Sequence, residues 1–297
     1  MPELKTCWID GKALPNPIGE VNPTINPASG ETLAQIADAT AEEVDLAVRA
    51  ADRVFARGDW RKMPTSKRSQ TLINLANLIR ANAEELAQLE SRNAGKTITD
   101  ARDEIQYGAN ILQFFAGILP AFCGETAPVS GNGIGLVFRE PVGVCGLIVP
   151  WNFPFVVTLW KVAPALAMGN SVVLKPAPAT PLTALRLAEL AQEAGIPDGV
   201  LNVVFGGAEV GRSLVLHPLV RKVSFTGSTR TGKEVMRMAA EGVKRVSLEL
   251  GGKSASLVFA DANVEKAAET VWSVFANAGQ DCCARSRMLI QREVYND

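Results

Sequence analysis

The residues best suited to covalent chemistry lie near the end of the sequence, where the turn Gly279-Gln280-Asp281 runs into Cys282 and Cys283. A thiol beside flexible backbone is suited to act as a nucleophile, and Glu249, 33 residues upstream, could supply the carboxylate that activates water. Taken alone, a free cysteine is more often a small buried apolar residue, and Glu249 an ordinary surface acid. The pair nevertheless predicts thiol-based chemistry.

A glycine-rich turn at 225–233 follows a predicted strand and opens a predicted helix. Backbone N–H groups and the helix dipole favour an anion there, so Gly227, Ser228 and Gly232 are candidates for holding a nucleotide pyrophosphate. The turn approaches a P-loop, but Glu234 stands where the magnesium-binding Ser or Thr of a P-loop nucleotide hydrolase is expected. A tight structural connection is the plainer interpretation.

Two further polar residues lie at expected strand ends. Lys175 ends a β-rich run, and the carboxyl ends of parallel strands are where open α/β sheets bind ligands, so Lys175 could bond a ribose. Asn152 lies between Pro150 and Pro154, a rigid setting for an amide that donates to a developing oxyanion. The plainer interpretations are a solvated lysine and an asparagine that supports a turn.

The elements that must position these residues follow from the hydrophobic pattern. Helices are expected at 41–55, 66–93 and 97–122. Strands are then expected at 143–149, 171–174, 201–204, 222–225, 245–248 and 254–259. Helices are expected between these strands, at 155–167, 181–194, 210–215, 231–240 and 264–276. The alternation predicts an α/β fold with a Rossmann-like, mostly parallel sheet and flanking helices, interrupted by a hairpin-like excursion at 124–140.

Composition excludes several classes of protein. The 297 residues are 47% hydrophobic and 21% charged, typical of a soluble globular chain of about two domains. The 30 basic and 31 acidic residues give a formal net charge of -1, which leaves no electrostatic excess for nucleic acid or an anionic membrane. Five cysteines without framework spacing, and an N-terminus without an apolar signal run, favour the cytoplasm.

Two other features restrict the interpretation. Pro141 to Trp160 carries no formal charge and is long enough to span a bilayer, but Gly143, Pro150 and Pro154 predict a strand, a turn and then a helix. His217, the only histidine, leaves no base for a Cys-His hydrolase and gives no reason to expect a metal site.

Together, these residues resemble the NAD(P)-dependent aldehyde dehydrogenase superfamily along the whole chain. The resemblance implies that Cys282 is the nucleophile, Glu249 the catalytic carboxylate and Asn152 the oxyanion donor, with Lys161 on the active-site proton path. It also implies a cofactor site at Trp151, Lys175, Gly227, Ser228, Gly232 and Leu250. Residues expected around the substrate funnel are Trp160, Asp281 and Cys283.

The mechanism implied by the resemblance begins with attack of the Cys282 thiolate on an aldehyde carbonyl. The Asn152 amide and the Cys282 backbone N–H hold the oxyanion, and hydride transfer to NAD or NADP leaves a thioester. Glu249 then activates the water that releases a carboxylic acid. Cys283 is expected to be a packing residue or a neighbour able to trap an oxidised Cys282.

Two residues depart from the common family pattern. Pro178 replaces the glutamate with which many NAD-preferring members bind the ribose hydroxyls. We therefore leave NAD and NADP open and hypothesise that NADP is tolerated, because no carboxylate at this position repels its phosphate. Asp281, directly before the nucleophile, resembles the aminoaldehyde-oxidising branch and suggests 4-aminobutanal-like substrates that carry an ammonium group.

The resemblance also implies a division into domains. We expect a dinucleotide-binding domain at 1–123 and 142–252, an oligomerisation-type hairpin excursion at 124–141, and the start of an incomplete α/β catalytic domain at 253–297. Family chains continue through the rest of that domain and form homodimers or homotetramers. We therefore expect little dehydrogenase activity from the 297-residue polypeptide alone, and a non-catalytic nucleotide-binding fragment is the main alternative.

Overall fold

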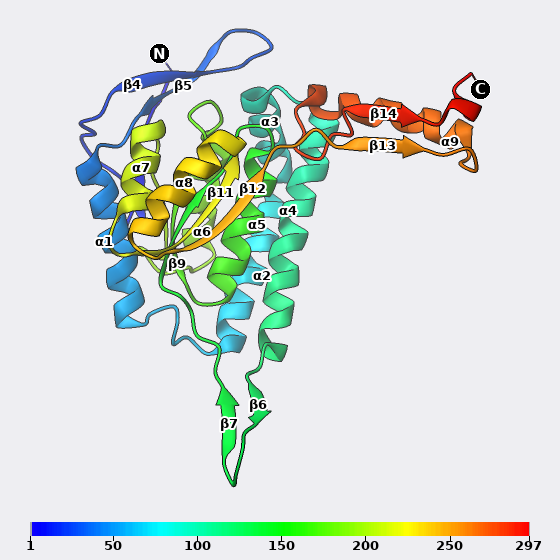
Figure 1. The fold of residues 1–297 in the computed structure, drawn as a ribbon. Coiled ribbons are helices and arrows are strands. Elements are labelled where there is room, and N and C mark those ends of the chain that lie inside the picture. The colour runs from blue at the N-terminus through cyan, green and yellow to red at the C-terminus, as the bar shows by residue number, and fades with distance from the viewer. Residues whose placement is uncertain (1, 297) are drawn as a thin grey trace.

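The computed structural model describes residues 2–296, and its centre is a seven-stranded sheet with helices on both faces (Figure 1). Five parallel strands form the middle of this sheet: β8 (Val144–Ile148), β9 (Ser171–Lys175), β10 (Leu201–Val203), β11 (Val220–Gly227) and β12 (Arg245–Leu250). Their spatial order, β12-β11-β8-β9-β10, is doubly wound, because the chain reverses direction across the sheet between β8 and β11. The predicted Rossmann-like, mostly parallel sheet is confirmed.

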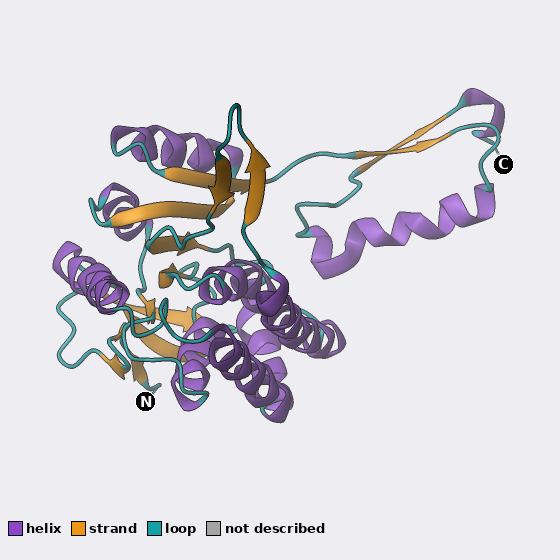
Figure 2. Ribbon diagram, turned by 90° about the horizontal axis from the view of Figure 1, so that it is seen from below, coloured by secondary structure: helices purple, strands orange, loops and turns teal. Residues whose placement is uncertain are grey.

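Two layers of helices enclose the sheet (Figure 2). One face is covered by α1 (Ala41–Arg57), α7 (Ala208–Leu216) and α8 (Thr229–Glu241). The other face is covered by α5 (Pro154–Ala167) and α6 (Leu182–Glu193). Outside them lie α2 (Thr65–Ala81), α3 (Ala83–Ala94) and α4 (Ile98–Ile118), followed by a short 3-10 turn, η1 (Leu119–Ala121). This outer layer contacts α5, which carries part of the candidate site.

Local sequence explains where the important helices begin. Thr40 and Glu43 form a capping box at the start of α1, and Ser228 caps α8 by accepting a hydrogen bond from the Thr231 backbone N–H. Pro154 opens α5 at a position where a missing N–H costs nothing. The uncharged segment 141–160 therefore forms β8, a turn and α5, as predicted. No helix within residues 2–296 combines the length and apolar character needed to cross a membrane.

The first part of the chain differs from the prediction in two ways. The single helix expected at 66–93 is two helices, because Asn82 has non-helical backbone angles (φ -105°, ψ 20°) and its side-chain amide donates to the Leu78 carbonyl. Short strands that we did not predict also precede α1. They are β1 (Leu4–Lys5), β2 (Trp8–Ile9), β3 (Lys12–Ala13), β4 (Val21–Ile25) and β5 (Thr32–Ala37).

These N-terminal strands serve two sheets. β2 pairs antiparallel with β10 and β3 pairs antiparallel with β2, which extends the central sheet, whereas β1, β5 and β4 form a separate three-stranded sheet. Most of them are only two residues long, too short for a period-2 pattern to be visible.

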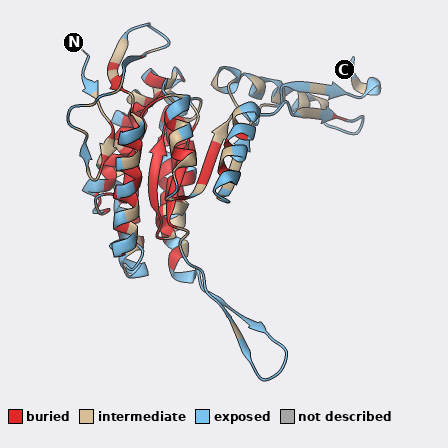
Figure 3. Cartoon of the chain, turned by 60° about the vertical axis from the view of Figure 1, so that its left-hand side comes forward, coloured by how far each residue is buried: buried red, intermediate tan, exposed pale blue. Residues whose placement is uncertain are grey.

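Two segments project from the enclosed body (Figures 1 and 3). The expected hairpin is an antiparallel pair, β6 (Glu125–Pro128) and β7 (Ile134–Val137), and it is largely exposed. The second segment is an arm in which β13 (Ala255–Val258) pairs in parallel with β14 (Arg287–Ile290). Between and after these strands lie α9 (Val264–Glu269), η2 (Thr270–Gly279) and η3 (Arg292–Val294).

The arm corrects the prediction of one α-helix over 264–276. Only Val264–Glu269 is α-helical, and the chain continues as the 3-10 segment η2. No residue of η2 is buried, and Trp272 is 77% exposed, so tertiary packing does not stabilise α-helical geometry there.

Gly108 allows α4 to pack closely against α5. A Cβ at this position would lie 2.6 Å from Leu159 Cδ1 and 3.0 Å from the Phe155 ring, whereas nothing lies within 4 Å of a Cβ at Gly117 on the same helix. We expect Gly108→Val to lower the free energy of unfolding by about 1–3 kcal/mol through overpacking. Urea denaturation measures this loss. Gly117→Val is the matched control, and equal stabilities of the two variants would contradict the close contact.

Candidate active site

An open cavity of about 1830 Å³ lies between α5 and the strands β11 and β12. It reaches the carboxyl ends of the central strands, next to the point where chain order reverses. Most of the predicted site residues line it: Trp151, Asn152, Trp160, Lys161, Gly227, Ser228, Glu249, Leu250, Asp281, Cys282 and Cys283. The other two, Lys175 and Gly232, lie outside its lining.

Strand alternation explains the polar floor of the cavity. Lys222, Ser224 and Thr226 on β11 face the cavity, while Val223 and Phe225 are buried on the opposite face. β12 repeats the pattern, since the side chains that line the cavity there include Arg245, Ser247 and Glu249. The cavity runs along this face of β11 and β12, where Ser224 is buried, Lys222 and Ser247 are partly exposed, and Arg245 and Glu249 are exposed.

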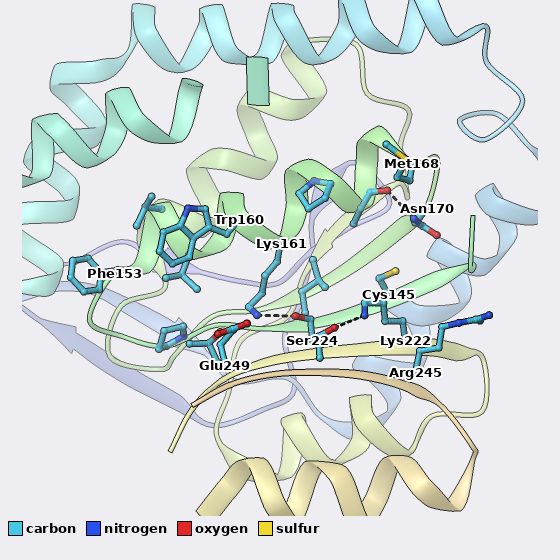
Figure 4. Close-up of a pocket in the computed structure, with 18 of the residues that line it drawn as sticks. Cys145, Phe153, Trp160, Lys161, Met168, Asn170, Lys222, Ser224, Arg245 and Glu249 are labelled. Atoms are coloured by element: carbon cyan, nitrogen blue, oxygen red, sulfur yellow. Dashed lines mark hydrogen bonds between the residues drawn. The ribbon is translucent and has the colours of Figure 1, made fainter. Parts of the chain in front are cut away.

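Lys161 projects from α5 toward this floor (Figure 4). Its Nζ donates to Ser224 Oγ at 2.8 Å, and next to this pair Lys222 Nζ donates to Ser247 Oγ at 2.6 Å. Burial lowers the pKa of Lys161 to about 8, while the Glu249 carboxylate acts in the opposite direction. Lys161 can therefore exchange a proton near neutral pH.

Asn152 is tied to the loop that precedes the cysteines. Its side-chain Nδ2 donates to the Gln280 carbonyl at 2.7 Å, and Asn277 Nδ2 donates to the Asn152 carbonyl at 2.9 Å. Asn277, Ala278 and Gly279 all have left-handed backbone angles, with φ of 48°, 56° and 74°. Ala278 is costly in this conformation. The reciprocal bonds therefore hold a strained loop against the sheet.

Cys282 follows this loop and is exposed. Its carbonyl oxygen would lie 3.9 Å from a Cβ on Gly252, so the loop passes beside the backbone that follows Glu249. Partial desolvation, the Cys283 thiol at 3.7 Å and the Asp281 carboxylate raise the pKa of Cys282 to about 11. At neutral pH the thiol is thus protonated, and no hydrogen bond within residues 2–296 links it to Glu249.

The glycine turn after β11 is built for close approach. A Cβ at Gly232 would lie 2.5 Å from Leu250 Cδ2, so glycine lets α8 pack tightly on the end of β12. Ser228 caps α8 through the Thr231 N–H, and the helix N-terminus opens on the edge of the cavity. This is the strand-to-helix geometry suited to a pyrophosphate, and both Gly227 and Leu250 lie beside it.

Lys175 ends β9 on the other side of β8. Its Nζ donates to the Pro176 carbonyl at 3.0 Å, and burial lowers its pKa to about 8, opposed by the charge of Asp38. Lys175 acts on Asp38 in turn. Burial raises the pKa of Asp38, and the charge of Lys175 lowers it. The pair places one carboxylate near Lys175 despite the proline at position 178.

Four residues with clear contacts here were not singled out from the sequence: Asp38, Lys222, Ser224 and Asn277. The alternation of polar and apolar residues along 222–226 was a usable signal for two of them. Asp38 and Asn277 act through contacts distant in sequence, and no local pattern marks them.

The described residues contain one group of possible metal ligands. Asp281, Cys282 and Cys283 each offer one ligand atom, and these atoms lie within 4.8 Å of one another. They are three consecutive residues at the cavity mouth. A metal bound there would occupy the thiol that the covalent chemistry requires.

A doubly wound sheet with a glycine turn, a strand-end lysine and a cysteine at its carboxyl edge defines a dinucleotide-binding class of protein. The aldehyde dehydrogenase family profile matches residues 16–297. The chain belongs to the aldehyde dehydrogenase family.

Relatives and solved structures agree with this assignment. NADP/NAD-dependent aldehyde dehydrogenase PuuC of Escherichia coli is 45% identical over 98% of this chain and 60% of its own length. 4-Trimethylaminobutyraldehyde dehydrogenase A of Danio rerio is 42% identical over 97% of this chain and 56% of its own length. A structure of aldehyde dehydrogenase from Bacillus cereus in complex with NAD+ superimposes with a TM-score of 0.95 at 42% identity, covering 99% of this chain and 60% of that one. The chain thus spans about 60% of these relatives' length.

The environment of Cys282 predicts slow reaction at neutral pH. Because only the thiolate is nucleophilic, we expect alkylation of Cys282 by iodoacetamide to rise about tenfold per pH unit between roughly pH 7 and 10. Cys283→Ala removes a neighbour that disfavours the thiolate, so it should accelerate the reaction at pH 8 by about threefold. Peptide mass spectrometry measures the rate at this cysteine. Cys123→Ala, which removes a distant exposed thiol, is the control, and a plateau below pH 9 would contradict the raised pKa.

Proposed function

We propose that the protein to which this chain corresponds oxidises an aldehyde to a carboxylic acid, with hydride transfer to NAD or NADP. The observation that carries the proposal is the convergence of Asn152, Glu249 and Cys282 on one cavity at the carboxyl edge of a doubly wound sheet. These residues supply an amide donor, a carboxylate and a thiol. Acyl chemistry through a thioester requires one of each.

In the proposed reaction, the Cys282 sulfur attacks the aldehyde carbon while the thiol proton passes to the Glu249 carboxylate. The neutral form of Lys161 then takes this proton, which leaves Glu249 free for the later hydrolysis. The Asn152 amide and the Cys282 backbone N–H stabilise the oxyanion. A bound nicotinamide cofactor supplies the hydride acceptor that this chain lacks. Glu249 then removes a proton from water, which attacks the thioester and regenerates the thiol as the acid departs.

Lys161 gives this scheme a route for protons. Its pKa of about 8 and its bond to Ser224 let it take up or release a proton in the same cavity as Glu249. The Glu249 carboxylate stabilises the charged form of Lys161.

The residue types at this edge of the sheet suit a dinucleotide. The free N-terminus of α8 beside Gly227 and Ser228 would hold the pyrophosphate, Lys175 the adenosine ribose, and Trp151 and Leu250 the nicotinamide side. We propose that NADP is tolerated beside NAD because Pro178 carries no charge, while the nearby Asp38 is partly neutralised by Lys175. PuuC, whose name records use of both cofactors, supports this proposal.

The parts of the chain have separate roles in this proposal. We propose that 1–123 and 142–252 form the cofactor domain, that 124–141 serves homodimer or homotetramer assembly, and that 253–297 belongs to the catalytic domain. The exposed apolar residues of the hairpin, among them Ile134 at 80% and Leu136 at 61%, support a role in association. The five free cysteines support a reducing compartment such as the cytoplasm.

A second candidate, cofactor binding without turnover, is favoured for the 297-residue chain alone by the exposure of Cys282 and by its raised pKa. We expect calorimetric titration of this chain to show binding of NAD and NADP, with little formation of NAD(P)H from aldehydes. Cofactor binding and turnover should be measured on one sample. Absence of binding by either cofactor would sink the proposed function. Robust turnover would contradict the expected low activity of this chain. Binding of NADP about 100-fold weaker than that of NAD would exclude the proposed tolerance of NADP.

We further propose that the substrate carries an ammonium group, as in 4-aminobutanal, because Asp281 lies next to the nucleophile in the cavity lining. The name of the Danio rerio relative, a dehydrogenase of a cationic aldehyde, supports this. Reversible addition of an aldehyde to Cys282 protects it from iodoacetamide. We expect Asp281→Asn to weaken protection by 4-aminobutanal about two- to fivefold and to leave butanal unchanged. Asp261→Asn, an exposed acid on the same arm, is the control, and an equal effect on both aldehydes removes the explanation.

A further inference from the structure

We propose that the buried cluster Glu90, Lys96 and Glu104 positions the Asn152 amide for oxyanion binding. The proposal rests on the proposed function, in which Asn152 donates to the oxyanion. Glu90 lies on α3, Glu104 on α4, and Lys96 between the two helices. None of the three lies near the nucleophile in sequence, and they act on the turn before α5 from the layer of helices beneath it.

Glu90 holds the beginning of α5. Its Oε1 accepts the Phe155 backbone N–H at 3.1 Å, and its Oε2 accepts the Thr183 hydroxyl at 2.8 Å. Phe155 lies in the first turn of α5, whose N–H groups have no partner within their own helix. A fully buried carboxylate therefore caps α5 from another helix, and it also matches the positive end of the helix dipole.

Lys96 holds the other side of the same turn. Its Nζ lies 2.6 Å from Glu104 Oε2 and 3.7 Å from Glu90 Oε1, with its side chain fully buried. The same ammonium lies 4.7 Å from the centre of the Phe153 ring. Phe153 and Phe155 are thus both fixed by the cluster, and Asn152 directly precedes this pair.

The energetic cost of the cluster argues for a role beyond stability. Burial raises the pKa of Glu90, and it raises the pKa of Glu104 to about 7, although Lys96 lowers both. Buried ion pairs of this kind are often no more stabilising than apolar residues of similar volume. They do, however, impose one geometry, because each charged atom must face its partner.

That geometry reaches the reacting atoms through Asn152. The side-chain amide has two N–H groups, of which one donates to the Gln280 carbonyl and fixes the plane of the amide. The second is then available for an oxyanion on a carbon attached to Cys282. A shift of the turn by a fraction of an ångström would misplace both bonds at once.

Two reactions of Cys282 separate positioning from general damage. Acylation by p-nitrophenyl acetate passes through a tetrahedral oxyanion as the thiolate attacks the ester carbonyl and p-nitrophenolate leaves. Alkylation by iodoacetamide displaces iodide without an oxyanion. We expect Glu90→Gln to lower the ratio of the acylation rate to the alkylation rate about tenfold to 100-fold, in the same direction as Asn152→Ala. The alkylation rate itself should stay within about twofold of wild type.

Glutamine at position 90 keeps the shape of the side chain but removes its charge and turns an N–H donor toward either the Phe155 backbone N–H or the Thr183 hydroxyl. The control is Glu84→Gln on the same helix, whose carboxylate pairs with Arg102 at the surface and does not touch the turn. We expect this variant to keep the wild-type ratio. Both rates are followed at Cys282 by peptide mass spectrometry, at one pH.

Each outcome decides a separate point. If Asn152→Ala lowers the ratio and Glu90→Gln does not, the positioning role is overturned and the proposed function stands. If Asn152→Ala leaves the ratio unchanged, the oxyanion role of Asn152 fails and the inference fails with it. An equal fall in both reactions for Glu90→Gln reduces the cluster to a structural role. Should Glu90→Gln not fold, Glu104→Gln, at the less buried end of the cluster, decides the matter, with an expected fall in the ratio of about threefold.

Discussion

The reciprocal hydrogen bonds between the Asn152 turn and the loop before Cys282 are the interaction on which the site depends. Residues 253–296 of the arm include almost no buried side chains, so packing alone does not hold the cysteines over the sheet. Two bonds, from Asn152 to the Gln280 carbonyl and from Asn277 to the Asn152 carbonyl, make that connection instead. They also explain how the left-handed run at 277–279 is maintained, because a strained loop persists only where its surroundings fix it.

The electrostatics of the cavity follow from leaving one face of β11 and β12 uncovered. Alternation along the strands places Lys222, Arg245 and Glu249 on that face, and Lys161 meets them from α5. Desolvation lowers the pKa of Lys161. Partial desolvation, the Cys283 thiol and the Asp281 carboxylate disfavour the Cys282 thiolate. The lysine is thus prepared for proton transfer, but the thiol still requires a change of surroundings to ionise at neutral pH.

Much of the architecture was predictable, because it follows from the local periodicity of hydrophobic residues. The alternation of β-rich runs and helices after residue 136 predicted a parallel sheet, and the prolines and glycines of 141–160 predicted strand, turn and helix. Strand order was not predictable in this way, since it depends on which faces pack. The errors at Asn82 and in η2 arise because helical periodicity continues past both positions, although Asn82 bonds the Leu78 carbonyl and no buried residue of η2 stabilises an α-helix. The roles of the candidate site residues stay predictions, although most of those residues meet at one cavity.

The roles proposed for Cys282 and Asn152 place opposite demands on the structure, since the first requires access and the second a fixed position. The thiol lies on an exposed arm where it can meet an aldehyde, whereas an oxyanion donor must be held to within a fraction of an ångström. The chain meets the second demand with Pro154, the dipole of α5 and three buried charges, all on the rigid side of the site. The hydrogen bonds at Gln280 and Asn277 link this rigid side of the site to the arm. In the proposed reaction, the precision of the oxyanion donor is therefore set by the layer of helices that holds α5, and the arm supplies mainly access to the thiol.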